Sequence, residues 1–77
     1  MVQQMQGQSN TGTTDQDYNL ISVLYHALQS AAVCDTYMED AEQAGDRELT
    51  EFFQQVKEQN CEQAERAKKL MAQRIGQ

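Results

Sequence analysis

The chain has 77 residues, 39% of them hydrophobic and 23% charged, with no Pro and no Trp, and a chain of this size forms one small domain at most. Its formal net charge of -6 disfavours binding to nucleic acid or to an anionic membrane surface, since both are negatively charged. The longest apolar run covers residues 31–34, whereas a membrane span needs about 20 residues, so no spanning helix is expected.

The two cysteines, Cys34 and Cys61, are too few and too widely spaced for a disulfide framework or a Cys-x-x-Cys motif. The first residues have neither the basic flank nor the apolar stretch of a signal peptide. We therefore expect reduced thiols and a cytoplasmic location.

Residues 1–14 contain four Gln, three Thr and two Gly but few apolar side chains. Such a segment buries too little surface to offset the entropy lost on ordering. The composition predicts a disordered, Gln-rich tail over residues 1–14 and one helical domain over residues 15–75.

A helix is predicted over about 16–44, where neither Gly nor Pro interrupts a stripe with alternating steps of four and three residues. Thr13 or Thr14 can cap its start, and Gly45 provides the left-handed residue that ends helices. The stripe consists of Leu20, Leu24, Ala27, Ala31, Cys34, Met38 and Ala41.

A second helix is predicted over about 47–74, with Asp46 as its N-cap. Because only Gly45 and Asp46 separate the helices, the fold class is all-α and the helices must form an antiparallel two-helix hairpin. The stripe expected to face the first helix is Leu49, Phe53, Val56, Asn60, Gln63, Ala67 and Leu70.

The first helix is apolar over more than one seam, since Ile21 and Leu28 widen the stripe on one side and Val23 and Tyr37 on the other. That breadth is typical of a helix with two neighbours, as in a four-helix bundle. A lone hairpin is also marginal in stability. We therefore expect a homodimer that completes a four-helix bundle, and the alternative is a hairpin that docks onto an unidentified protein partner.

Asn60 and Gln63 are polar positions on the predicted apolar stripe of the second helix. A buried amide needs hydrogen-bond partners. One interpretation is that Asn60 sets register and partner number, as a core Asn does in coiled coils. The other is that this polar layer stands where a metal site once was.

The segment from Asn19 to Ala72, above all YMEDAEQAGDRELTEFFQQVKEQNCEQAERAKKL, resembles the helical hairpin that forms half of ferritin-like and rubrerythrin-like proteins. In that family each hairpin supplies a Glu from one helix and a Glu-x-x-His pair from the other to hold two metal ions. The resemblance places these three ligand positions at Ser30, Asn60 and Gln63. It therefore implies a vestigial ligand layer, with no metal and no cofactor.

Ser30 and Cys61 are expected at equal distance from the turn, which puts the three substituted positions in one layer. Neutral side chains can hydrogen-bond to one another there, whereas carboxylates without metal would repel. Asp35 and Glu42, on the border of the seam, are weak alternative ligands, because a spacing of seven residues is too far for both to chelate one ion within a hairpin. His26, the one histidine, falls on the face away from the stripe.

No Gly-rich phosphate loop and no Ser-His-Asp set is present, and neither Cys has a base nearby in the sequence, so no enzyme activity is expected. The favoured function is a non-catalytic, self-associating ferritin-like module with a structural or protein-interaction role. The alternative is an iron-binding or iron-handling protein that uses Asp35, Glu42 or surface carboxylates.

Charge is distributed unevenly along the predicted hairpin. Residues 1–46 carry seven acidic and no basic side chains, whereas residues 47–77 carry five acidic and six basic ones. The turn is acidic and the last turns of the second helix are basic. An antiparallel pair of hairpins would place unlike charges together, which favours that orientation.

Overall fold

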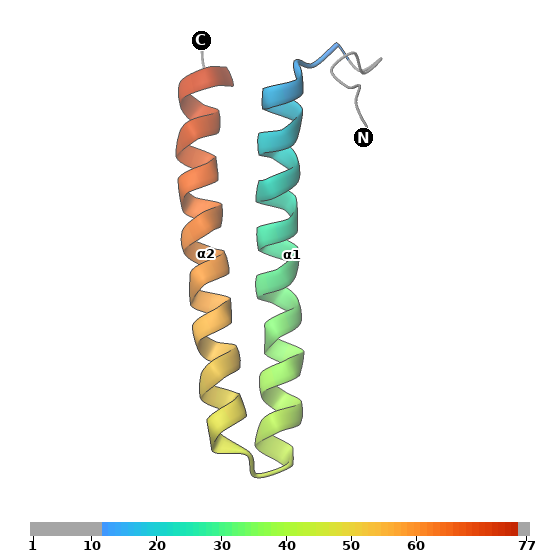
Figure 1. Ribbon diagram of the computed structural model, residues 1–77, viewed down its shortest axis with the longest axis vertical. Helices are drawn as coiled ribbons and strands as arrows, with labels where there is room; N and C mark the ends of the chain where they lie inside the picture. Colours follow the sequence, from blue (N-terminus) through green and yellow to red (C-terminus); the bar gives the residue numbers. More distant parts are fainter. Residues whose placement is uncertain (1–11, 76–77) are drawn as a thin grey trace.

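The computed structural model describes residues 12–75, which form two α-helices, α1 (Asp15–Gln43) and α2 (Arg47–Ile75). The helices run antiparallel and side by side (Figure 1). The predicted all-α hairpin is confirmed, with helix boundaries within one residue of those expected. Residues 1–11 of the predicted tail lie outside the described residues. We call the end with the interhelical connection the turn end, and the other the open end.

The turn is closed by backbone hydrogen bonds that follow α1. The N–H of Asp46 donates to the carbonyl of Ala41 at 2.9 Å, and the N–H of Gly45 donates to that of Glu42 at 3.0 Å. This pair of bonds is a Schellman motif, which needs a left-handed residue just past the helix. Gly45 has a φ of 72°, so the predicted role of this glycine is confirmed.

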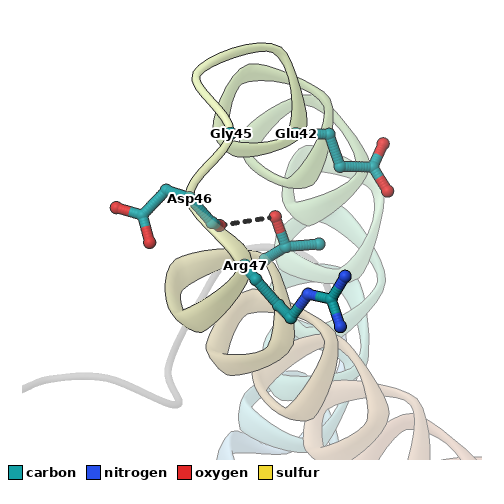
Figure 2. A pocket seen from close by; sticks show the side chains of 5 residues that line it. Glu42, Gly45, Asp46 and Arg47 are labelled. Atoms are coloured by element: carbon teal, nitrogen blue, oxygen red, sulfur yellow. Dashed lines mark hydrogen bonds between the residues drawn. The ribbon is translucent and has the colours of Figure 1, made fainter.

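The two helix starts are capped differently. Asp46 Oδ1 accepts a hydrogen bond from the N–H of Leu49 at 3.1 Å, as expected of an N-cap, and Thr50 Oγ1 donates to the Asp46 carbonyl at 2.9 Å (Figure 2). Thr14 occupies the N-cap position of α1 with extended backbone, but its side chain makes no capping hydrogen bond.

The predicted stripe of α1 is confirmed as the side that packs against α2. Its members are all buried or half-buried, and the most enclosed is Cys34, at 2% exposure. Small residues make up the fully buried part of the hairpin. These are Ala27, Ala31, Cys34, Ala41, Ala64 and Ala67.

The predicted stripe of α2 is confirmed at Phe53, Val56, Asn60 and Ala67 but wrong at Leu49, Gln63 and Leu70, which are exposed. Ala64 is buried and Met71 half-buried. After Asn60 the seam continues with a step of four residues to Ala64, where the prediction took three. Both steps are allowed by a helix with 3.6 residues per turn, and the small Ala64 lets the two backbones approach.

Contacts between the helices define their register. The Lys57 Nζ donates a hydrogen bond to Asp35 Oδ1 at 2.7 Å, and the ring centroids of Tyr37 and Phe53 lie 5.5 Å apart. Both pairs join residues at nearly equal distance from the Gly45–Asp46 turn, as expected of a straight antiparallel hairpin.

Candidate interaction surface

Large apolar side chains lie mainly on the outside of this hairpin. Many of them keep more than a third of their surface exposed to solvent, whereas the fully buried positions are all Ala or Cys. The exposed set comprises Tyr18, Ile21, Val23, Tyr25, Leu28, Val33, Tyr37, Leu49, Phe52 and Leu70.

Part of this set forms one continuous surface, which we call the long face. It contains two rows with a spacing of seven residues, and residues so spaced lie nearly above one another on a helix. All positions are exposed except Val56, which is half-buried. The α1 row is Val23, Ser30, Tyr37 and Ala44, and the α2 row is Leu49, Val56, Gln63 and Leu70.

Two shallow grooves between the helices show that both rows lie on the same side of the hairpin. At the turn end, Tyr37 from α1 and its C-cap residue Ala44 line a groove together with Leu49 and Phe53 from α2. At the open end, Val23 lines a second groove together with Leu70. The long face therefore extends from one end of the molecule to the other.

Charged side chains border the two grooves, with opposite sign at the two ends. Asp40 and Asp46 line the groove at the turn end, and Arg74 lines the one at the open end. Neither Asp40 nor Arg74 forms an ion pair among residues 12–75. Both charges are thus available to a second molecule.

The opposite face of the hairpin has a different character. Its α1 row, again with a spacing of seven, changes from Ile21 and Leu28 at the open end to Asp35 and Glu42 toward the turn. Asp35 and Glu42 line a groove with Gln54 from α2. This face is apolar over only half of its length.

The predicted polar layer of Ser30, Asn60 and Gln63 is divided between two environments. Asn60 is half-buried in the seam, and its side chain makes no hydrogen bond within residues 12–75. Ser30 and Gln63 are exposed and occupy matching places in the middle of the long face. Of the three positions, then, only Asn60 lies in the seam.

The donors of that layer do not fit the di-iron site of the family that the sequence resembles. A hydroxyl and two neutral amides stand where two carboxylates and an imidazole would be needed. Within the described residues, no three His, Cys, Asp or Glu side chains lie close enough together to hold a metal ion. His26 is exposed, and its ring packs in a T-shaped arrangement with that of Tyr25, with the ring centroids 5.4 Å apart.

Asp35, one of the two replacement ligands considered from the sequence, already has a partner. Its bond to Lys57 raises the pKa of the lysine, first through the hydrogen bond and then through the opposite charge. Glu42 lies near the turn, where its carboxylate points away from that of Asp46 (Figure 2). A cation at Asp35 would have to compete with the Lys57 ammonium for the charge of this carboxylate.

Lys57 was missed by the sequence reasoning. The residue is half-buried, so that its aliphatic stem lies along the seam while the ammonium reaches Asp35. A second ion pair, between Lys68 and Glu65 at 2.7 Å, lies on the surface of α2 and lowers the pKa of Glu65. The sequence signal for Lys57 was its place one position after Val56, at the edge of the stripe.

The chain matches no family model, no curated protein and no solved structure in comparisons with all three. The resemblance to the ferritin-like hairpin therefore stays a prediction. In the part of the chain that the structure describes, neither helix has the length and apolar character of a membrane span.

Proposed function

We propose that this protein is a non-catalytic self-association module, in which two copies of the hairpin complete a four-helix bundle. One observation carries the proposal: many large apolar side chains are exposed on the outside of the hairpin, while its fully buried positions are all Ala or Cys. A hairpin that worked alone would be expected to place them the other way round.

The energetic argument follows from side-chain size. Burying a Leu, Val or Phe side chain contributes about 1.5–3 kcal/mol, whereas one methyl or methylene group contributes only about 0.8 kcal/mol. Burial in the Ala-rich seam therefore offsets little of the conformational entropy that is lost when two 29-residue helices become ordered. A second copy would cover Val23, Tyr37, Leu49 and Leu70 and supply the missing burial.

A structural or protein-interaction role in the cytoplasm fits the same features. Cys34 and Cys61 are both free thiols, and the neutral middle layer offers no group for acid-base or metal chemistry. A ferritin-like origin would account for the hairpin length and for the place of Ser30, Asn60 and Gln63.

Sedimentation equilibrium of the full chain tests the proposal. We expect a particle of twice the chain mass of 8.8 kDa at micromolar concentration, together with a thermal midpoint that rises with protein concentration. A helical chain that stays at the monomer mass up to about 100 µM would overturn it, because a functional dimer of this size needs roughly micromolar affinity or better.

A further inference from the structure

We propose that the long face is the surface through which two copies associate, and that the copies pack antiparallel about a twofold axis through the layer of Ser30 and Gln63. This inference rests on the self-association proposed above and names its surface and orientation.

The choice of face follows from its continuity. The long face is apolar at the turn end and at the open end, with only the neutral Ser30 and Gln63 between. The opposite face carries Asp35 and Glu42 in its turn half, and covering those carboxylates would cost desolvation energy. A second hairpin can therefore cover the apolar rows of the long face along their whole length, with Asp40, Asp46 and Arg74 at the ends of the grooves rather than within the rows.

The orientation follows from the spacing of the layers. A twofold axis through Ser30 and Gln63 places the Val23 and Leu70 layer of one copy against the Tyr37 and Val56 layer of the other, because both layers lie seven residues from the axis. At the axis itself, the hydroxyl of Ser30 and the amide of Gln63 can bond to their own counterparts.

Charge complementarity supports the same orientation. Arg74 lies eleven residues from Gln63 toward the open end, and Asp40 lies ten residues from Ser30 toward the turn. The antiparallel arrangement thus brings each arginine to within about one residue rise, ~1.5 Å along the axis, of the level of the partner's aspartate. A parallel pair would instead bring the two acidic turns together.

The area of the long face is sufficient for a stable dimer. Helices of 29 residues are roughly 43 Å long, and two helices side by side are about 20 Å wide, so the face measures roughly 800 Å² in projection. A standard protein interface buries about 800 Å² on each partner.

A first experiment compares matched substitutions on the two faces. Val23 and Leu28 lie on the same helix and are both 49% exposed, Val23 on the long face and Leu28 on the opposite one. We expect Val23→Gln to weaken the dimer about tenfold or more, because each dimer loses two apolar contacts, and Leu28→Gln to change the dissociation constant less than about threefold. Circular dichroism at high concentration verifies that both variants are helical.

A second experiment tests the orientation by charge exchange. Asp40→Arg and Arg74→Asp should each weaken the dimer, by roughly threefold to tenfold for two exposed ion pairs, and the double variant should return to within about threefold of the original. Failure of the double variant to recover would overturn the antiparallel orientation.

The outcomes separate this inference from the proposed function. If the unmodified chain dimerises but Leu28→Gln weakens the dimer more than Val23→Gln, the long face is the wrong surface and the self-association stands. If the unmodified chain is a monomer throughout, both proposals fall. Selective weakening by Val23→Gln together with recovery in the charge exchange supports the inference.

Discussion

The N-cap residues of the two helices are chemically similar but contribute differently. Asp46 bonds to the N–H of Leu49, and Thr14 makes no side-chain capping bond. We expect Asp46→Ala to lower the free energy of unfolding by about 1 kcal/mol and Thr14→Ala to leave it within about 0.3 kcal/mol of the original, as measured by urea unfolding at one protein concentration. An equal loss in both variants would mean that the cap bond itself is not what stabilises α2.

Asn60 is half-buried in the seam, and its amide makes no hydrogen bond within residues 12–75. We expect Asn60→Leu to raise the free energy of unfolding by about 1 kcal/mol, because an unpaired amide is replaced by an apolar group of similar size. The same variant should also form assemblies other than the dimer, as loss of a core Asn does in coiled coils. Urea unfolding and sedimentation velocity measure the two effects.

Gln63→Leu serves as the control for Asn60→Leu, since Gln63 is exposed in the hairpin. Gln63→Leu should change the stability of the hairpin itself little, and its effect should be confined to the dissociation constant of the dimer. A clearly lower stability of Asn60→Leu with an unchanged assembly would contradict the assignment of Asn60 as an unsatisfied register residue.

At the level of the elements, one ion pair links α1 to α2. The pair with Asp35 raises the pKa of Lys57 above its usual 10.5, so the stability it contributes is fully present below 10.5 and is lost as the pH rises through the folded-state pKa. We expect the difference in unfolding free energy between the original chain and Asp35→Asn to shrink toward zero between about pH 8 and about pH 11.5.

A control variant isolates this effect from the general loss of charge. Glu39 is an exposed acid on α1 that makes no ion pair among residues 12–75, so Glu39→Gln should show no such alkaline change. A stability difference for Asp35→Asn that does not shrink at all as the pH rises beyond 10.5 would show that Asp35 acts through something other than Lys57.

At the level of the whole molecule, salt should distinguish the two ways in which the hairpins can pair. In an antiparallel dimer unlike charges meet, so added salt should raise the dissociation constant by a modest factor, about twofold to fivefold between roughly 0.05 M and 0.5 M NaCl. In a parallel dimer the acidic turn ends meet, so salt should tighten binding. Sedimentation equilibrium across this range gives the sign directly.

Much of the fold could be predicted from the sequence because it depends on local interactions. Gly45 next to Asp46 ends one helix and starts the next, and a connection this short allows only an antiparallel hairpin. The seam of α1 could also be predicted from the sequence, because Ala27, Ala31 and Cys34 follow helical spacing without an ambiguous step.

The seam of α2 was decided by packing between the helices. Periodicity allows either Gln63 or Ala64 to follow Asn60, and only the close approach to the Ala-rich side of α1 selects Ala64. Because Ala64 faces the seam, Gln63 and Leu70 face outward, where they form part of the long face. The pairing of Lys57 with Asp35 likewise depends on the register of the two helices. The spacing of residues within one helix does not indicate that register.

The sequence by itself thus determined the helices, the turn with its Asp46 cap, the hairpin and the seam of α1, because each depends on residues within a few positions of one another or on unambiguous spacing. The tertiary structure decided which side chains of α2 face the seam and which face solvent. The reason is physical: burial is a property of two surfaces in contact, and a helix with apolar residues on several sides can bury any of them until its neighbour is in place. Here the fully buried side chains are small ones, while large ones such as Val23, Tyr37 and Leu70 remain exposed.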